Sequence, residues 1–600
     1  MNINERFKDC SPEQTVEKIR KILEGIGLTV QERWHGSGID DCWSVTVWAQ
    51  ECEPFRSNGK GVTQALARAS AYAELIERIQ CGLLLYKFQS LSRTPGMDLH
   101  HFAPDARYMT MAELEQEGEW MDHVIAAYGG GLTRKKLAQL SKIYACTDED
   151  KILTLPFYSL FEDKYVYIPA GIATCVYATN GCCAGNTREE AWVHAMSEMI
   201  ERYSAQTRLV SGEAMPPIPE EVLDRFPTVK RILSQIRQRD KYHVTLLDLS
   251  MGDGFPVVAA RVINKETKDY LVNIAADPVL EIAIDRTLTE FFQGRHVDHF
   301  RSGRGSGILK SITDVNYAHN ASNQMENCTG FFTADFFAEE LTCQRECAEF
   351  ADNSNKSNKE LLQYMLDLYR KMGRPVYVRN YSFLGFPSYH FIVPGFSEIR
   401  GYLLPEPVSE YALGEEAAKA LRDPRSASIP QLAILLTYYD KISTMVNRRE
   451  NFSSLVGLPM DLVKPRHLLF TALSCAAWRL GRMQDAIGFL TDALRGAGGD
   501  RQYLSCLRQY LTLLHKGIDP AIVRSILEKS FYTDAVEKLY RNLLEHKDPY
   551  HGQLLRCSGT CEGCPHRDLC SFPQVREALA RVGAHYKTYT DGQSREHLAV

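Results

Sequence analysis

Apolar and polar positions follow two different periods along the first two thirds of the chain. Residues 12–26 place apolar side chains every three or four positions, which predicts an amphipathic helix, and residues 43–48 alternate as a half-buried strand does. Further strands are predicted at 165–170, 242–249, 256–263, 270–275, 375–381 and 390–393, and helices are predicted to begin near Thr63, Thr187 and Pro278. This part of the chain is therefore predicted to be an α+β domain.

Beyond about residue 405 the pattern changes to one helix after another. With 600 residues the chain is too long for a single core, because compact domains rarely exceed roughly 300 residues. We predict an α+β domain at 1–405, an all-helical domain at 406–548 and a C-terminal segment at 549–600. Within the helical part, residues 473–496 resemble one tetratricopeptide unit, although an irregular helical bundle fits them equally well.

Charge and composition exclude several classes of partner. Hydrophobic residues make up 44% of the chain and charged residues 24%, with a net charge of -6 and the two signs well mixed. A nucleic-acid-binding protein would show a basic patch, so we expect no nucleic-acid partner. Residues 1–10 lack an apolar signal segment, and no apolar run approaches the roughly 18 residues of a membrane span. We expect a cytoplasmic protein that does not enter a membrane.

One acidic motif, Glu-x-x-Glu-Arg, occurs twice in otherwise apolar helices. It comprises Glu74, Glu77 and Arg78 in the first helix and Glu198, Glu201 and Arg202 in the second. The same helix faces continue to Ser70 in the first and to Glu190 and His194 in the second. Carboxylates spaced in this way repel one another, and a magnesium ion that also binds nucleotide phosphates would relieve the repulsion. The alternative is that each motif forms solvated Glu–Arg pairs on a helix surface.

A third helix is predicted at 279–294. It places Arg286, Glu290 and Gln293 on one face, and Gly294 suits a left-handed helix end with Arg295 just beyond it. Arg286 and Arg295 could contact phosphate oxygens through their guanidinium groups. The alternative for Arg286 is a weak intrahelical pair with Glu290.

Three segments of the chain resemble the motifs of the YcaO family. Residues 180–203 match the pattern N-G-x-x-A-G-N-T-x-x-E-A followed by E-x-x-E-R. Residues 59–78 are similar to the first nucleotide helix of the family, and residues 286–295 are similar to its third. The resemblance covers roughly residues 1–405, and it implies that ATP is held without a P-loop motif, which this sequence lacks.

The resemblance also implies a role for each motif residue. The residues that would ligate Mg²⁺ are Glu74, Glu77, Glu198 and Glu201, and together with Arg202 they would form the catalytic centre. The residues that would line ATP are Lys8, Thr15, Ser70, Arg78, Asn186, Glu190, Arg286, Glu290, Gln293 and Arg295. At Thr15 the family has a serine. Asn186 and Thr187 also begin the second acidic helix, where Glu190 would close a capping box with Thr187.

The implied reaction is activation of a backbone amide in a peptide or protein by phosphorylation of its oxygen. Azoline-forming members use a substrate side chain as nucleophile, whereas thioamide-forming members use sulfide from a sulfur-donor partner. This chain ends in DGQSREHLAV rather than in a proline-rich tail and has no E1-like domain, which favours amide activation or thioamidation of another substrate over heterocycle formation on a small peptide. The resemblance also allows a homodimer. Two alternatives are a non-catalytic, peptide-binding scaffold or accessory factor that recruits the sulfur donor through its helical tail, and a small-molecule kinase.

Four cysteines are crowded near the C-terminal end of the chain. Cys557, Cys561, Cys564 and Cys570 follow the spacing C-x3-C-x2-C-x5-C. Four thiolates within reach of one centre could hold a [4Fe–4S] cluster or a tetrahedral Zn²⁺. The spacing departs from the paired C-x2-C units of common zinc modules, which favours iron–sulfur over zinc.

Overall fold

The computed structural model falls into two compact units, one of residues 1–86, 100–406 and 574–600 and the other of residues 87–99 and 407–573. It describes residues 3–83, 105–129, 131–144, 151–211, 214–250, 254–299, 308–309, 332–333, 345–399, 416–417, 419–421, 423–443, 467–495, 501–554 and 572–587. Among these residues no helix combines the length and apolar character needed to cross a membrane.

Antiparallel sheets form the frame of the first unit. One sheet has the order β1 (Val30–His35), β2 (Trp43–Ala49), β3 (Cys52–Gly61), and a second has the order β10 (Tyr270–Ala276), β9 (Val257–Asn264), β8 (Tyr242–Asp248). A third has the order β4 (Arg107–Thr110), β5 (Lys151–Ser159), β13 (Tyr377–Asn380), β14 (Ser388–Ile392), β7 (Cys182–Ala184), with β6 (Lys164–Pro169) paired to β5. Two short strands, β11 (Ile308–Leu309) and β12 (Phe332–Thr333), pair in parallel. All the predicted strands are found within a few residues of their expected positions.

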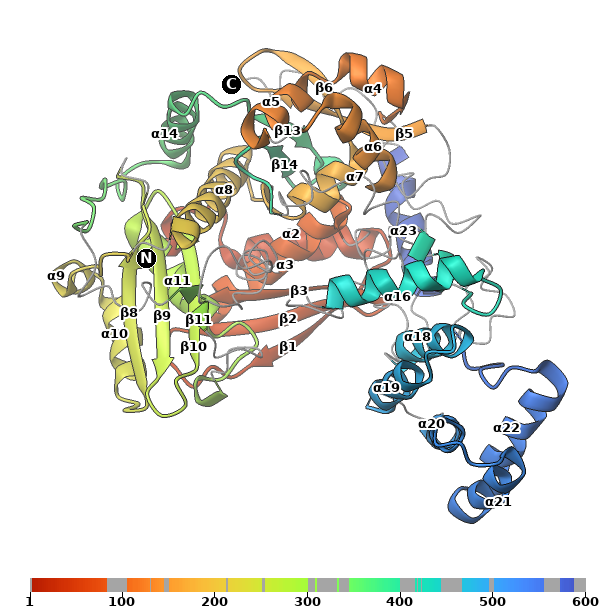
Figure 1. The fold of residues 1–600 in the computed structure, drawn as a ribbon. Coiled ribbons are helices and arrows are strands. Elements are labelled where there is room, and N and C mark those ends of the chain that lie inside the picture. The colour runs from red at the N-terminus through yellow and green to blue at the C-terminus, as the bar shows by residue number, and fades with distance from the viewer. Residues whose placement is uncertain are drawn as a thin grey trace. The chain divides into compact units, whose positions relative to one another are not determined.

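Helices α2 (Pro12–Gly25) and α3 (Gln64–Gln80) belong with the first sheet. Figure 1 shows α3 along one face of β1–β3, with α2 beside it, and these elements are in contact. Ser11 begins α2 with a capping box, and the Thr63 hydroxyl begins α3 by accepting a 3.2 Å hydrogen bond from the Leu66 N–H. The predicted starts of both helices are confirmed.

Helix α8 (Arg188–Ser211) packs its apolar face against the third sheet. The ring of Trp192 lies edge-on to Tyr389 and Phe391 of β14, with centroids 5.7 and 5.2 Å away. Helix α14 (Asn358–Lys371) covers the same core, where Tyr369 donates a 2.8 Å hydrogen bond to the Met196 carbonyl. Because this face of α8 is filled by aromatic and sulfur-containing side chains, its acidic residues point elsewhere.

Helix α11 (Leu280–Glu290) follows β10 and ends earlier than the sequence predicts. The predicted helix ran to Gly294, but residues 291–294 form turns, and Gly294 has a φ of 70°. The prediction of a left-handed glycine there is confirmed, and only the last helical turn is wrong. The remaining helices of this unit are α1 (Ile3–Arg6), α4 (Met111–Glu117), α5 (Glu119–Tyr128), α6 (Arg134–Tyr144), α7 (Ala170–Ile172), α9 (Glu220–Leu223) and α10 (Pro227–Arg237). Single turns of other helix types lie at Ala173–Tyr177, Val297–His299 and Ser382–Leu384.

Every element that the structure describes in the second unit is a helix. The helices of eleven or more residues in this unit are α16 (Ile429–Ser443), α18 (His467–Arg479), α19 (Met483–Leu494), α20 (Arg501–His515), α21 (Pro520–Ser530) and α22 (Thr533–His546). They share one core of leucine and alanine side chains, and Gly481, with a φ of 72°, turns the chain between α18 and α19. The α+β class with a helical C-terminal region is thus confirmed.

The last helix, α23 (Phe572–Lys587), belongs to the first unit from residue 574 onward. Its Arg581 donates a 2.6 Å hydrogen bond to the carbonyl of Gly27, just after α2. The four clustered cysteines precede this helix and lie outside the described residues.

Candidate functional site

The two acidic motifs lie on buried helix faces. Glu77 on α3 is 7% exposed and Glu201 on α8 is 5% exposed. The alternative of solvated surface pairs is therefore wrong for the second glutamate of each motif. Both helices contact the short strand β7, which holds their faces near one another.

The acidic faces are close enough for the charge of Glu198 to act on Glu77. Burial raises the pKa of Glu77 to about 8, and the charges of Glu74 and Glu198 raise it against the lowering effect of Arg78. Arg78 lies 3.2 Å from Glu74 and 3.4 Å from Glu77 between nitrogen and oxygen atoms. The first motif therefore carries its own counter-ion, and its carboxylates are only partly neutralised.

The second motif is arranged in a similar way. Arg202 lies 3.6 Å from both Glu198 and Glu201, and Glu201 also accepts a 3.1 Å hydrogen bond from the N–H of Ala276 in β10. Burial raises the pKa of Glu201, which the charges of Arg202 and Arg286 oppose. A buried carboxylate with incomplete compensation is a good position for a cation.

A tight polar cluster surrounds the first turn of α8. Glu190 accepts hydrogen bonds from Lys8 at 3.0 Å, the Asn186 side chain at 3.1 Å and the Asp9 N–H at 3.3 Å. Burial alone would raise the pKa of Glu190, but these donors outweigh burial and lower it. Thr15 donates a 2.9 Å hydrogen bond to Asn186, so both predicted N-terminal residues, Lys8 and Thr15, join the cluster.

The capping box predicted at the start of α8 is formed in one half. The Thr187 hydroxyl accepts a 3.2 Å hydrogen bond from the Glu190 N–H. The Glu190 carboxylate accepts instead from Asn186, whose backbone N–H is 3.4 Å away. The carboxylate is thereby turned toward Lys8.

Residues of α11 approach the same region from another side. Arg286 lies 3.9 Å from Asp277, and Glu290 pairs with Lys60 of β3. The predicted alternative, an ion pair between Arg286 and Glu290, is therefore wrong, because each residue pairs with a different partner. Burial raises the pKa of Asp277 to about 6 and the charge of Arg286 opposes this.

The remaining predicted residues lie at the edges of this arrangement. Gln293 donates a 2.9 Å hydrogen bond to the carbonyl of Asn58 in β3. Ser70 is half-buried on α3, one turn before Glu74, and Arg295 is half-buried beyond the end of α11. The structure thus gathers segments from α3, α8, α11 and the N-terminus, with Arg295 at the periphery.

Three residues near the site were missed or left without a role by sequence reasoning. Asp277 and Lys60 carry no signal in helical periodicity, because both lie outside helices. His194 was recognised as part of the acidic helix face but given no role. It lies between Glu190 and Glu198, and its Nδ1 is buried without a hydrogen-bond partner in the described part of the chain.

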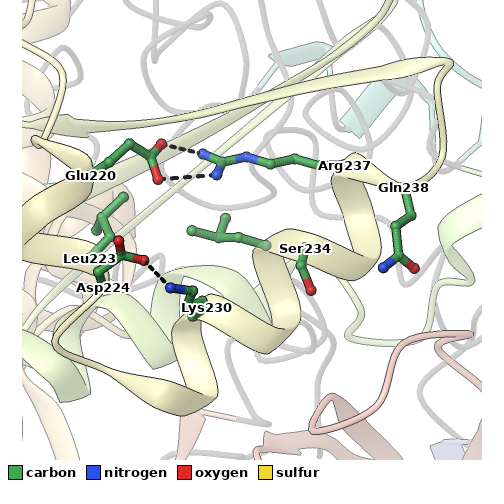
Figure 2. Close-up of a pocket in the computed structure, with 8 residues that line it drawn as sticks. Glu220, Leu223, Asp224, Lys230, Ser234, Arg237 and Gln238 are labelled. Atoms are coloured by element: carbon green, nitrogen blue, oxygen red, sulfur yellow. Dashed lines mark hydrogen bonds and ion pairs between the residues drawn. The ribbon is translucent and has the colours of Figure 1, made fainter.

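A ready-made metal cage is absent from the part of the chain that the structure describes. Within those residues no three His, Cys, Asp or Glu side chains are gathered closely enough to hold a metal ion. A separate surface pocket is lined by residues of α9 and α10, and Figure 2 shows it crossed by the ion pairs Glu220–Arg237 and Asp224–Lys230. It contains none of the predicted site residues.

Sequence comparison identifies relatives across most of the chain. An uncharacterized protein of Haemophilus influenzae is 25% identical over 570 residues, which cover 91% of this chain and 93% of that protein. The ribosomal protein S12 methylthiotransferase accessory factor YcaO of Escherichia coli is 28% identical over 403 residues, which cover 65% of this chain and 66% of that protein. Among solved structures, a heterocyclase in complex with substrate and cofactor matches with a TM-score of 0.45 and 20% identity, covering 65% of this chain and 53% of that chain.

The sequence model of one protein family, described as YcaO cyclodehydratase, ATP- and Mg²⁺-binding, matches residues 58–397 of this chain. That stretch is more than half of the chain and contains both acidic motifs and α11. The chain belongs to the YcaO family.

Proposed function

We propose that this protein is a Mg²⁺-dependent, ATP-using enzyme that activates a backbone amide of a peptide or protein by phosphorylating its oxygen. The observation that carries the proposal is the burial of one glutamate of each motif, Glu77 at 7% and Glu201 at 5% exposed, on two helices that both contact β7. A buried carboxylate is costly unless a partner compensates its charge, and a bound cation would supply that compensation. The description of the family, which names ATP and Mg²⁺, supports the same conclusion.

The donors present suit magnesium. Mg²⁺ is usually bound through one or two carboxylates together with phosphate oxygens and water, rather than in a cage made by the protein alone. Such a site needs no preformed group of three ligands. Glu74, Glu77, Glu198 and Glu201 would hold the ions, which when bound supply positive charge against the phosphates.

Once Mg²⁺ is bound, the arginine side chains that pair with these carboxylates could bind phosphate oxygens instead. Arg78 and Arg202 each lie within 3.6 Å of two motif glutamates. Glutamates engaged with a metal ion no longer need arginine, and guanidinium groups bind phosphate oxygens well. Lys8, on Glu190 at the first turn of α8, would add a further positive charge at a helix N-terminus, where anions bind favourably.

The proposed chemistry transfers one phosphoryl group. A nucleophile adds to the amide carbonyl carbon and loses its proton, and the resulting oxyanion attacks the γ-phosphorus and displaces ADP. The carbon–oxygen bond then breaks and phosphate leaves. The site residues would act by positioning and by charge stabilisation. A substrate side chain as nucleophile would give a heterocycle, and sulfide would give a thioamide.

A second candidate is an accessory role without turnover. The E. coli relative is named as an accessory factor of a methylthiotransferase that acts on ribosomal protein S12. By analogy, this chain would bind a protein substrate and assist a sulfur-inserting partner, which its helical unit would recruit. Both candidates bind a peptide or protein substrate, and they differ in whether ATP is consumed.

The deciding experiment measures Mg²⁺-dependent ATP binding and hydrolysis by the full chain. We expect Glu198→Gln/Glu201→Gln to abolish both while the protein stays folded. The matched control, Glu220→Gln/Glu221→Gln, removes two carboxylates from α9 and should behave like wild type. Unchanged nucleotide affinity in the first variant would contradict the metal assignment. Wild-type protein that binds Mg-ATP without hydrolysing it, even with substrate, would favour the accessory role.

A further inference from the structure

The three-stranded sheet of β1, β2 and β3 has one face against α3 (Figure 1) and a second, outer face. Ser57 of β3 faces α3, since its hydroxyl donates a 2.6 Å hydrogen bond to the Ala71 carbonyl. Side chains alternate along a strand, so Arg56 points to the outer face together with Trp48, which lies opposite it in β2. The strand registers give the residues of the outer face as Gln31, Arg33, His35, Ser44, Thr46, Trp48, Arg56, Asn58 and Lys60.

Neutral polar groups occupy the middle of the outer face. The Thr46 hydroxyl donates a 2.6 Å hydrogen bond to Asn58 and lies 2.7 Å from Nε2 of His35. At the end nearest α11, Lys60 takes its counter-ion, Glu290, from that helix. None of the residues of the outer face is itself acidic. The face therefore consists of cations, neutral polar groups and one aromatic ring.

Two arginines of the outer face have no carboxylate partner. Arg33 and Arg56 are exposed, and neither forms an ion pair within the part of the chain that the structure describes. Other exposed arginines of the same unit do form such pairs, and Arg20 and Arg237 each bind a glutamate. The free guanidinium groups of Arg33 and Arg56 can therefore bind carboxylates from outside the chain, with the two-pronged geometry that arginine favours.

Trp48 lies between these two arginines. The guanidinium carbon of Arg33 is 5.5 Å from the centre of the Trp48 ring, and Arg56 lies directly across from Trp48 in the next strand. Arg33 and Arg56 are thus two strands and two residues apart, which places their backbones roughly 12 Å from each other. The Trp48 side chain is only half-buried, so part of the ring is accessible. We call Arg33, Trp48 and Arg56 the Arg–Trp–Arg row.

Two cations on either side of an aromatic ring fit a short acidic segment. We propose that the Arg–Trp–Arg row docks an extended acidic peptide of a partner protein, with two carboxylates four residues apart and an apolar side chain midway between them. In an extended peptide these three side chains share one face, and the carboxyl-bearing residues are roughly 13 Å apart, close to the spacing of the two arginines. A nucleic acid fits less well, because the chain has a net charge of -6 and the row supplies only Arg33 and Arg56 as free cations.

The fluorescence anisotropy of a labelled peptide, titrated with the full chain, tests this docking. The peptide has the core Glu-Thr-Phe-Thr-Glu, whose threonines favour an extended backbone. We expect saturable binding to wild type that weakens about tenfold in Arg33→Gln/Arg56→Gln, the loss expected for two exposed ion pairs. Both arginines are exposed, so this variant should fold like wild type. Arg20→Gln/Arg237→Gln removes the same charge from other exposed arginines and should bind like wild type.

Altered peptides test the fit without changing the protein. Glutamine in place of both glutamates should weaken binding about tenfold, and placing the two glutamates side by side should weaken it as well. The inference would be overturned if wild type showed no saturable binding, or if the altered peptides or the Arg33→Gln/Arg56→Gln variant bound equally well. A single-stranded oligouridylate that binds more tightly than the peptide, and loses affinity in the same variant, would replace the peptide site with a nucleic-acid site. None of these measurements requires Mg²⁺ or ATP, so the inference goes beyond the proposed function and does not depend on it.

Discussion

Lys8 and Glu190 form an ion pair, with 3.0 Å between Nζ and Oε1, that joins the segment before α2 to the first turn of α8. Glu190 is buried and Lys8 is partly exposed. The same carboxylate accepts a hydrogen bond from the N–H of Asp9, so it holds the backbone of this segment as well. One buried carboxylate thus places the N-terminal lysine at the site.

We expect Lys8→Met to destabilise the protein by about 1–3 kcal/mol, because it leaves the buried Glu190 without its cation. Adding Glu190→Gln to Lys8→Met should recover part of this loss. Chemical denaturation of wild type, both single variants and the double variant gives the coupling energy. The pair Lys21–Glu17 in α2 is exposed on both sides and serves as control, with an expected coupling near zero. Equal coupling in the two pairs would contradict the structural role.

Glu77 makes stability depend on pH when no metal is bound. Its pKa is 4.5 ordinarily and about 8 in the folded protein, so the folded state holds the proton more tightly. The contribution is present at acid pH and is lost as the pH rises from 4.5 through about 8, by at most roughly 1.4 kcal/mol per pH unit. Mg-ATP should restore stability at the alkaline end, because it binds the ionised carboxylates.

Melting temperatures measured between about pH 5 and pH 9, with and without Mg-ATP, check this linkage. Glu77→Gln should flatten the dependence in the metal-free protein and remove much of the gain from Mg-ATP. The exposed Glu221→Gln should leave both unchanged. A pH slope in Glu77→Gln equal to that of wild type would show that Glu77 is not the responsible group.

A substitution at Gly59 tests the close packing of β3 against α3. In Gly59→Ala the new methyl group would meet the Ala67 carbonyl oxygen and the Ala71 nitrogen, which are backbone atoms and cannot turn aside. We expect a loss of about 1–3 kcal/mol in unfolding free energy. Gly25→Ala, at the end of α2 with open space around it, should be neutral or slightly stabilising. A Gly59→Ala variant as stable as wild type would contradict the close packing.

The acidic half of the site was predictable because helical periodicity places Glu74 beside Glu77 and Glu198 beside Glu201. The contact between Lys60 and Glu290 was not predictable. Lys60 lies in a strand that contains Pro54, Gly59 and Gly61, residues that sequence patterns assign to turns, so β3 was not predicted. Its partner Glu290 was identified from the sequence as a site residue. A pairing between a strand and a helix far apart in sequence, however, depends on tertiary structure.

The end of α11 shows a similar limit. Helical periodicity continues through Phe291 and Phe292, but both side chains are buried and the backbone turns before Gly294. There the Gly294 N–H donates a 3.0 Å hydrogen bond to the Ser44 hydroxyl of β2. Packing against the sheet thus overrides the local helical preference, which no pattern within the segment reveals.

The cysteine cluster leads to a prediction that rests on sequence alone. We expect protein purified without oxygen to contain iron and acid-labile sulfide bound by Cys557, Cys561, Cys564 and Cys570, because four thiolates at this uneven spacing suit an iron–sulfur cluster better than a zinc module. Metal and sulfide analysis per chain checks this. Cys561→Ser/Cys564→Ser should lose the metal, and Cys10→Ser should keep it. Zinc without sulfide would replace the cluster with a tetrahedral site, and absence of both metals would mean free thiols. Glu198→Gln/Glu201→Gln should retain this metal in full, because its carboxylates belong to a separate site that takes oxygen-seeking magnesium.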